Sequence, residues 1–213
     1  MQDLPIFISY YTGDDYYKRC SDRIKSMCSS LGINLIVEEV QDLGSYYKNT
    51  LYKPQYILQK VKELKRDVIW IDVDTSIKKY SSCFKKWESD LLFSSNTGDI
   101  KGIKASPIGI KYNESSLDFM EEWAYSCKNK ISLNEVDFDH DILKYEILPR
   151  MIGKIDIDLM KDDMNYVDFS NGKVIDNGIS RTKNKNLEVS VVIDKNVRRS
   201  NSFDLLDLKN FKK

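Results

Sequence analysis

Asp72 and Asp74 follow directly on the apolar run of residues 68–71. Four apolar residues in a row, without polar alternation, are typical of a strand that is covered on both faces in the middle of an α/β sheet. Ligands of open α/β sheets bind outside the carboxyl ends of the strands. Side chains at positions i and i+2 of an extended segment point the same way, so both carboxylates can reach one hard divalent cation, such as Mn²⁺ or Mg²⁺.

The Asp-x-Asp spacing by itself is weak evidence for a metal site. Composition alone predicts about two or three such triplets in a chain this rich in aspartate. The other triplets are Asp137/Asp139, Asp139/Asp141 and Asp156/Asp158. Asp72 and Asp74 differ from these by their position at the end of a buried strand, and this position predicts a metal or nucleotide site.

Length and charge limit the classes of function. The chain has 213 residues, and its 33 basic and 33 acidic side chains give a net charge of zero. It has no net positive field to attract nucleic acid or an anionic membrane. No apolar run approaches the length of a membrane span, and the first residues lack the pattern of a signal peptide. We therefore expect a soluble, cytoplasmic protein without a membrane span, for which nucleic acid is a disfavoured partner.

The four cysteines, Cys20, Cys28, Cys83 and Cys127, have no zinc-type spacing, and His140 is the single histidine. Cys20 and Cys28 are expected on one helix, about 12 Å apart, which is too far for a disulfide. We expect four reduced thiols that are mostly buried. A Ser-His-Asp or Cys-His arrangement would have to use His140, and no local signature of those enzymes surrounds a serine or cysteine.

The start of the chain predicts a strand, a helix and a second strand. An apolar run at residues 6–10 ends at the turn sequence 11–15, and helical spacing continues from 15 to 31, where Gly32 stops it. The second strand is expected over residues 33–37. A β-α-β unit of this kind makes the two strands parallel, with a right-handed connection.

Three further segments have strong patterns. Lys53-Pro54 begins a helix, because proline suits the first helical position and apolar residues follow at helical spacing. Residues 103–110 are expected to form a strand, in which Pro107 predicts an edge or a bulge. Residues 115–128 have the periodicity of an amphipathic helix. Segments 38–50 and 75–99 favour no particular element.

Weaker patterns follow in the last third of the chain. Residues 142–148 are helix-like, segments 166–169 and 173–175 are typical of a hairpin, and residues 187–193 favour one last strand. We expect one domain over residues 1–195 and a C-terminal tail or linker over residues 196–213.

The order of these elements resembles that of the nucleotide-diphospho-sugar glycosyltransferases of the A-type (GT-A) fold. It resembles in particular the retaining galactosyl- and glucosyltransferase-like group and its small virus- and phage-encoded members. The motifs that carry the resemblance are Lys53-Pro54-Gln55-Tyr56-Ile57, Trp70-Ile71-Asp72-Val73-Asp74 and Asp139-His140-Asp141-Ile142-Leu143, the last being similar to the family's Asp-Gln-Asp-Ile-Leu. The resemblance implies an α/β protein with a single GT-A (Rossmann-like) domain, in which helices flank a central, mostly parallel mixed sheet.

The resemblance also implies roles for residues at the nucleotide end of the site. Asp72 would lie near the ribose and the cation, and Asp74 would ligate the cation that bridges the two phosphates. The segment Tyr10, Tyr11, Thr12 matches the uridine-binding segment, where a tyrosine would stack on the base. The alternative is that these tyrosines are ordinary core or surface residues at a strand end.

Asp139 and His140 match the family's pair beside the anomeric carbon. In a reaction that retains configuration, Asp139 would act as nucleophile or as electrostatic support for front-side attack. The family more often has glutamine where this chain has His140. A lone histidine in a polar loop is more often a capping or hydrogen-bonding residue than a catalyst.

A second departure from the family concerns the cation. The family often has a histidine near residue 176 that completes the coordination, and this chain has none there. Asp176 or Asn177 would substitute as an oxygen ligand. Arg181 or Lys183 would then contact the diphosphate. A solvated basic loop over residues 173–185 explains the same sequence without a ligand.

The resemblance thus implies a metal-dependent glycosyltransferase that uses Mn²⁺ or Mg²⁺. The donor would be a UDP-sugar and the acceptor a glycan or glycoprotein, such as a viral capsid glycan, in the host cytoplasm if the protein is viral. The alternatives are a transferase that acts on modified DNA bases, a sugar-nucleotide nucleotidyltransferase, and a non-catalytic carbohydrate- or protein-binding module. A nucleotidyltransferase is expected to have a Gly-rich, basic loop after the first strand, whereas residues 10–15 include one glycine and two acids.

Overall fold

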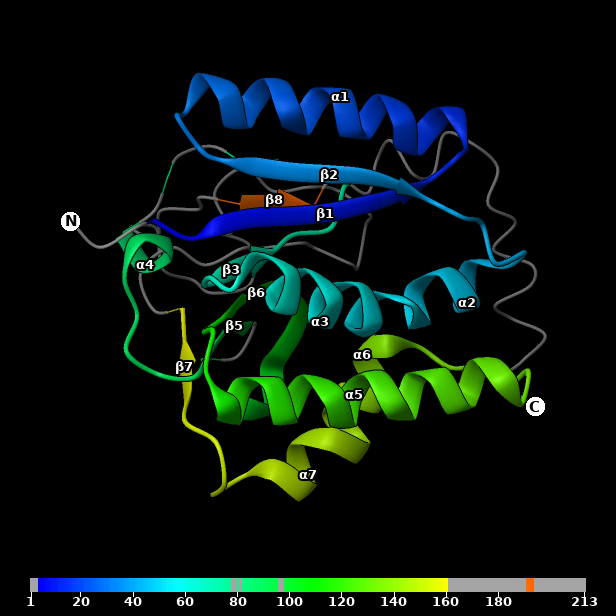
Figure 1. Cartoon of the computed structure of the whole chain (residues 1–213), viewed down its shortest axis with the longest axis vertical. Helices are drawn as coiled ribbons and strands as arrows, with labels where there is room; N and C mark the ends of the chain where they lie inside the picture. Colours follow the sequence, from blue (N-terminus) through cyan, green and yellow to red (C-terminus); the bar gives the residue numbers. More distant parts are fainter. Residues whose placement is uncertain (1–3, 78–79, 81, 96–97, 161–190, 194–213) are drawn as a thin grey trace.

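The computed structural model describes residues 4–77, 80, 82–95, 98–160 and 191–193. Within these residues, the centre of the molecule is a six-stranded sheet with the strand order β2-β1-β3-β6-β5-β7 (Figure 1). The strands are β1 (Ile6–Thr12), β2 (Leu35–Val40), β3 (Val68–Trp70), β5 (Leu91–Ser95), β6 (Ile103–Ile110) and β7 (Ile157–Leu159). Only β6 runs antiparallel to its neighbours among these described strands, so the sheet is mixed and mostly parallel, as the sequence predicted.

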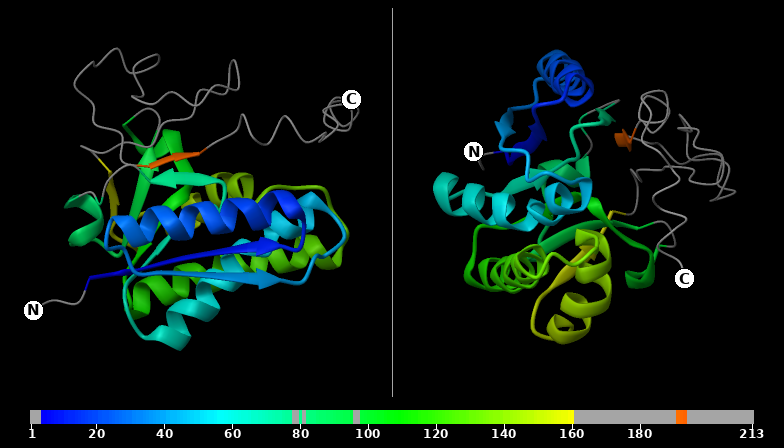
Figure 2. Two further views of the ribbon diagram at one scale, coloured as in Figure 1. Left: turned by 90° about the horizontal axis from the view of Figure 1, so that it is seen from above. Right: turned by 90° about the vertical axis from the view of Figure 1, so that its right-hand side faces the viewer.

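Helices cover both faces of the sheet. One face carries α1 (Asp15–Ser30), α4 (Ser82–Lys85) and the strand β4 (Thr75–Ile77), which pairs with β8 (Val191–Ile193) (Figure 2). The other face carries α3 (Lys53–Leu64) and α5 (Glu114–Ser132), which lie side by side (Figure 1). Short elements complete the order: α2 (Tyr46–Leu51), the 3-10 turn η1 (Ile100–Gly102), α6 (Asp139–Ile142), the π-helical η2 (Leu143–Ile147) and α7 (Leu148–Met151).

The covered faces explain the unbroken apolar run before Asp72. Successive side chains of a strand point to opposite faces. Val68 and Trp70 belong to the core under α3 and α5, whereas Ile69 and Ile71 belong to the core under α1. Because both faces are buried, both alternating sets must be apolar.

The β-α-β start agrees with the sequence prediction. The Asp14 side chain accepts a hydrogen bond of 2.8 Å from the Tyr17 N–H and so caps the first turn of α1. The helix is followed by Gly32, whose φ of 65° is a left-handed conformation that glycine adopts without strain. Cys20 and Cys28 are buried on α1 as free thiols, as expected.

The position of β6 corrects one prediction. Pro107 predicted an edge strand or a bulge, but β6 lies between β3 and β5. Pairing with β3 uses residues 108–110, and pairing with β5 shifts register between Phe93 and Ser95. Pro107 therefore lies at an irregularity, where its missing N–H removes no ladder hydrogen bond. The edge prediction was wrong and the bulge prediction is confirmed.

Two segments for which the sequence favoured no element contain helices and strands, and some predicted elements lie outside the described residues. The stretch 38–50 contains the end of β2 and most of α2, and the stretch 75–99 contains β4, α4 and β5. The expected hairpin around 166–175 and the tail from 196 lie outside the described residues, and only 191–193 of the last predicted strand are described, as β8. No helix in the described part of the chain is long and apolar enough to cross a membrane.

Candidate active site

A cavity of about 660 Å³ opens at the carboxyl ends of β1 and β3. Its walls come from the end of β1, the starts of α2 and α3, the turn after β3, the first half of β6 and the loop that leads into α6. The structure brings the following sequence-predicted residues together around it: Tyr10, Tyr11, Thr12, Asp72, Asp74, Asp139 and His140. The other predicted residues, Asp176 and Arg181, lie outside the described residues.

The two aspartates of the Asp-x-Asp motif reach the cavity from a turn. β3 ends at Trp70, and Val73 and Asp74 form a turn closed by a 3.0 Å hydrogen bond from the Thr75 N–H to the Asp72 carbonyl. The extended geometry that the sequence reasoning assumed is therefore absent from residues 73 and 74. Both side chains nevertheless line the same cavity.

Neighbouring elements hold this turn in place. The Asp72 N–H donates to Ser106 Oγ of β6 at 2.9 Å, and the indole Nε1–H of Trp70 donates to Asp72 Oδ1 at 3.0 Å. From α1, a guanidinium N–H of Arg23 donates to the Asp74 carbonyl at 3.2 Å. Asp74 is itself buried. The motif is thus held from both sides of the sheet.

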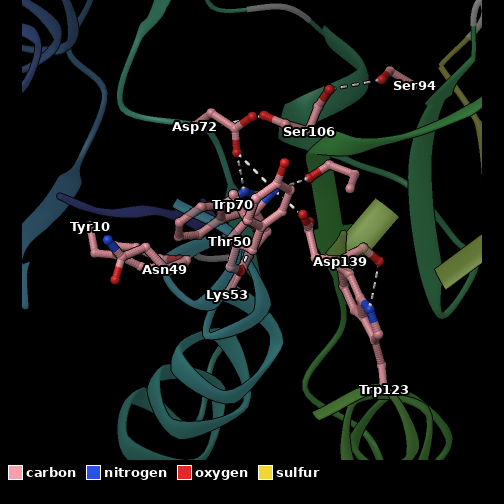
Figure 3. A network of polar contacts seen from close by, with 12 residues as sticks. Tyr10, Asn49, Thr50, Lys53, Trp70, Asp72, Ser94, Ser106, Trp123 and Asp139 are labelled. Atoms are coloured by element: carbon pink, nitrogen blue, oxygen red, sulfur yellow. Dashed lines mark hydrogen bonds and ion pairs between the residues drawn. The ribbon is translucent and has the colours of Figure 1, made fainter. Parts of the chain in front are cut away.

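Lys53 is the residue that connects the two acidic motifs. Its Nζ lies 3.1 Å from Asp72 Oδ1 and 2.7 Å from Asp139 Oδ2, and it donates to the Ala105 carbonyl at 3.3 Å (Figure 3). It also lies 5.7 Å from the ring centroid of Trp70, within reach of a cation–π interaction. Lys53 and Asp139 are only 7% and 4% exposed.

Sequence reasoning assigned Lys53 to a helix start and missed its place in the site. One signal was available: Lys53 lies four residues before Ile57, which belongs to the buried stripe of α3. Residues at i and i+4 share a helix face. A lysine on a buried face needs a counter-ion, since an unpaired buried charge is costly. The sequence could not show which carboxylates would supply it.

Burial and charge act in opposite directions on this ion pair. Burial alone lowers the pKa of Lys53, but the facing carboxylates of Asp139 and Asp72 raise it above its ordinary value, so the ammonium stays charged. Burial raises the pKa of Asp139, and Lys53 opposes that rise. The negative charge of Asp72 raises the pKa of Asp139 further, because two like charges that face the same lysine repel each other.

The backbone of Asp139 is fixed by α5. The indole Nε1–H of the fully buried Trp123 donates to the Asp139 carbonyl at 3.1 Å (Figure 3). Asp139 is also the first residue of α6, so its backbone direction is set at a helix start. The carboxylate therefore depends on α3 for its counter-ion and on α5 for its position.

His140 is a neutral group in this cavity. Burial lowers the pKa of its imidazole to about 4, and the nearby ammonium groups of Lys104, Lys53 and Lys144 add to that effect. At neutral pH the ring carries no charge and offers one hydrogen-bond donor and one acceptor. Like a glutamine side chain, the neutral ring can both donate and accept a hydrogen bond, although glutamine has one more N–H donor.

The tyrosines at the end of β1 have structural partners. The ring of Tyr10 packs against Tyr52, Tyr56 and Trp70, with centroids 5.1–5.7 Å apart, and its hydroxyl donates to the Asn49 carbonyl. The Tyr11 hydroxyl donates to Glu39 Oε2 at 3.1 Å. Both line the cavity, but the packing of Tyr10 favours its interpretation as a core residue.

No known protein-family profile matches the sequence, and no curated protein does. Solved structures match in fold. A glycosyltransferase involved in the glycosylation of the major capsid of PBCV-1 is 13% identical, with a TM-score of 0.64, over 92% of this chain and 100% of its own. The galactosyltransferase LgtC in complex with donor and acceptor sugar analogs is 10% identical, with a TM-score of 0.51, over 88% and 86%. Mouse xyloside xylosyltransferase 1 is 8% identical, with a TM-score of 0.50, over 89% and 97%.

The chain has the GT-A fold. The expected fold class and the resemblance to viral members are confirmed, since the similarity to the capsid glycosyltransferase spans nearly the whole of both chains. In this GT-A fold the cavity lies where open α/β sheets bind ligands, outside the carboxyl ends of β1 and β3. At these identities the likeness concerns the fold alone, so the chemistry must be argued from the residues.

We expect Lys53→Met to lower the free energy of unfolding by about 3–5 kcal/mol, because it leaves the buried carboxylate of Asp139 and the partly buried carboxylate of Asp72 without their counter-ion. The loss should shrink as the pH falls. A carboxyl group whose folded pKa lies above its unfolded value adds stability at lower pH, and Asp139 becomes such a group more strongly without Lys53. Urea unfolding at neutral pH and at about pH 5 measures both effects.

The matched control is Lys62→Met on the same helix. Lys62 pairs with Glu121 at a surface where both side chains are about half exposed, so its loss should cost at most about 1 kcal/mol. Equal stabilities of the Lys53→Met and Lys62→Met variants would contradict the structural importance of the Lys53 ion pair.

The lowered pKa of His140 predicts that the folded protein becomes less stable as the pH falls. The unfolded imidazole binds a proton below about pH 6.5, whereas the folded one resists protonation until about pH 4. The wild type should therefore lose stability as the pH falls through this window, and His140→Gln should lose less. Melting temperatures of both proteins at about pH 7 and about pH 5 test this, and identical pH shifts in the two proteins would contradict it.

Proposed function

We propose that this protein is a metal-dependent glycosyltransferase that moves a sugar from a UDP-sugar donor to a glycan or glycoprotein acceptor. The observation that carries the proposal is the convergence of two acidic motifs in one cavity of a GT-A fold, with Lys53 between them. Asp72 and Asp74 form one motif and Asp139 begins the other. The evidence that the two motifs converge is the pair of contacts that Lys53 makes with Asp72 and Asp139, and it does not depend on the spacing of the aspartates in the sequence.

The charge of the cavity supports a requirement for a cation. Among the described residues, six aspartates and two lysines line it: Asp14, Asp42, Asp72, Asp74, Asp139, Asp141, Lys53 and Lys104. Lys53 is already engaged with two of the carboxylates. A nucleotide diphosphate is an anion and would be repelled by this excess of carboxylates unless a divalent cation accompanied it. The cavity therefore suits a metal-bound nucleotide better than a free one.

Asp72 and Asp74 fit the role of cation ligands. Among the described residues, no three side chains of the metal-ligating types are arranged so that they could hold a metal ion by themselves. Mg²⁺ and similar ions at nucleotide sites commonly use one or two carboxylates and take the remaining ligands from the phosphates and water. When bound, Mn²⁺ or Mg²⁺ would neutralise charge on the departing diphosphate. Asp176 and Arg181 remain proposed as further contacts to the cation and the diphosphate.

We assign Asp139 to chemistry at the anomeric carbon. It lines the cavity, and its paired Lys53 fixes its orientation. In the proposed transfer, the acceptor hydroxyl oxygen bonds to the anomeric carbon, the bond from that carbon to the diphosphate breaks, and the hydroxyl proton leaves with UDP. Positive charge develops on the carbon during this exchange, and a preorganised carboxylate stabilises it. We propose retention of configuration, with Asp139 as nucleophile or as electrostatic support.

The acidic cavity and zero net charge support a glycan or glycoprotein acceptor over DNA. A DNA-directed enzyme needs basic groups to contact phosphates, and here carboxylates outnumber lysines around the cavity. One structurally similar protein is involved in the glycosylation of a major capsid. By this analogy we propose a viral capsid glycan as the acceptor.

Calorimetry and donor hydrolysis test the proposal directly. UDP should bind in the presence of Mn²⁺ and bind more weakly after chelation with EDTA. A screen of UDP-, GDP- and dTDP-sugars with Mn²⁺ should show hydrolysis of one UDP-sugar above the others. Metal-independent binding, or no nucleotide binding, would contradict the proposed function and favour a non-catalytic module.

We predict that Asp74→Asn abolishes the Mn²⁺-dependent part of UDP binding. The substitution keeps the shape of a buried side chain while removing the charge that a hard cation needs. Asp158→Asn is the matched control, since Asp158 belongs to another Asp-x-Asp triplet, on β7, and does not line the cavity. Wild-type UDP affinity in the Asp74→Asn protein would remove Asp74 from the site.

We predict that Asp139→Asn keeps the affinity for UDP but lowers turnover by at least about two orders of magnitude, the scale of one preorganised charged group. His140→Gln should keep activity within roughly tenfold, or about 1.4 kcal/mol of barrier. Steady-state kinetics with the donor found in the screen measure both. A His140→Gln variant as inactive as Asp139→Asn would make His140 the catalytic group.

A further inference from the structure

Three aromatic side chains form one wall beside Asp139. Phe138 lies 5.1 Å from Tyr47 and 6.3 Å from Tyr46, and the two tyrosine rings are 6.1 Å apart, all measured between ring centroids. We call Tyr46, Tyr47 and Phe138 the aromatic wall. It joins the start of α2 to the residue that directly precedes Asp139.

The aromatic wall is not part of either hydrophobic core. Among the described residues, the two core clusters and the side chains packed against them include none of its three members. All three rings are half-buried, and Tyr46 and Phe138 line the cavity. Large aromatic rings at a cavity surface provide apolar contact area at little cost in conformational entropy.

Hydrogen bonds hold the backbone segment that carries the tyrosines. Asp42 Oδ1 accepts hydrogen bonds from the Gly44 N–H at 2.8 Å and from Asn49 Nδ2 at 2.9 Å. Ser45 Oγ accepts from the Lys48 N–H at 3.2 Å and caps α2. The hydrogen bond from Asn49 and that from Gly44 lower the pKa of Asp42, so this carboxylate is charged. The wall is therefore preorganised and stands next to fixed polar groups.

We propose that the aromatic wall is the acceptor subsite and that its ligand is a neutral pyranose. This inference rests on the proposed function. The apolar C–H face of the sugar ring packs on the rings of Tyr46 and Phe138, while its hydroxyl groups face the polar atoms of Asp42, Ser45 and Asp141 along the same cavity. Because Phe138 is covalently next to Asp139, a sugar on the wall lies beside the proposed transfer point.

The charge around the aromatic wall favours a neutral sugar over a DNA base. A DNA base would also stack on aromatic rings, but the phosphates of the DNA backbone would meet the carboxylates of Asp42 and Asp141. A neutral pyranose meets the same carboxylates as hydrogen-bond acceptors for its hydroxyl groups. The wall and its acidic border therefore fit a glycan better than a DNA base.

Ligand-observed NMR tests the subsite without knowledge of the full acceptor. The wild-type protein with UDP and diamagnetic Mg²⁺ is titrated with a panel of methyl α- and β-pyranosides of common neutral hexoses and pentoses. Saturation transfer should be strongest at the ring C–H protons of one face. Tyr46→Ala and Phe138→Leu should each weaken the affinity for the bound glycoside by about tenfold.

Tyr125→Ala is the matched control. Tyr125 is on α5, is 66% exposed and does not line the cavity, so its removal should change glycoside affinity by less than roughly twofold. Melting temperatures show whether each variant is folded. Since Tyr46 and Phe138 come from different elements, one folded variant is enough to decide the outcome.

Calorimetry with UDP on the same protein variants separates the two proposals. If wild-type protein binds UDP with Mn²⁺ but no glycoside of the panel, or if glycoside affinity survives both wall substitutions, the acceptor subsite is wrong while the proposed function stands. Binding of a hydroxymethylcytosine oligonucleotide in place of the glycosides, with loss in both variants, also overturns the neutral-sugar assignment. Failure of wild-type protein to bind UDP instead contradicts the proposed function.

Discussion

The buried ammonium group of Lys53 is the interaction on which the candidate site depends. It lies within 3.1 Å of carboxylate oxygens from Asp72 and Asp139, which belong to distant parts of the chain. Two carboxylates near each other, one of them buried, repel each other, and a buried cation between them offsets that repulsion. Since Lys53 is the first residue of α3, the packing of this helix on the sheet and the electrostatics of the cavity are coupled.

The mixed sheet explains why so many polar groups reach one place. The parallel strands β1 and β3 end at the same edge of the sheet, so Thr12 and Asp72 become neighbours of one cavity. The antiparallel strand β6 approaches that edge with its first half, which brings Lys104 and Ser106 there. Ser106 then accepts the hydrogen bond that anchors the Asp72 backbone. Because β6 is antiparallel, residues from the beginning of this strand join residues from the ends of β1 and β3 in the site.

Much of the fold was predictable, and the failures have physical causes. The β-α-β start, α3 and α5 carry helical periodicity with start or stop residues, and β3 is an unbroken apolar run, so short-range preferences decide them. The short elements α2, β4 and α4 span too few residues to establish a period. The place of β6 was mispredicted because a register shift in its pairing accommodates Pro107 inside the sheet, and such a shift depends on a neighbouring strand.

The sequence by itself determined the main helices and strands, the two acidic motifs and the resemblance to GT-A glycosyltransferases, because each depends on residues close together in the chain. Only the tertiary structure decided that Lys53 joins Asp72 to Asp139, that Trp123 fixes the Asp139 backbone and that Phe138 meets Tyr46 and Tyr47. Each of these contacts joins segments far apart in sequence. Their partners are chosen by helix packing and strand order, and no local pattern of residue types records that choice.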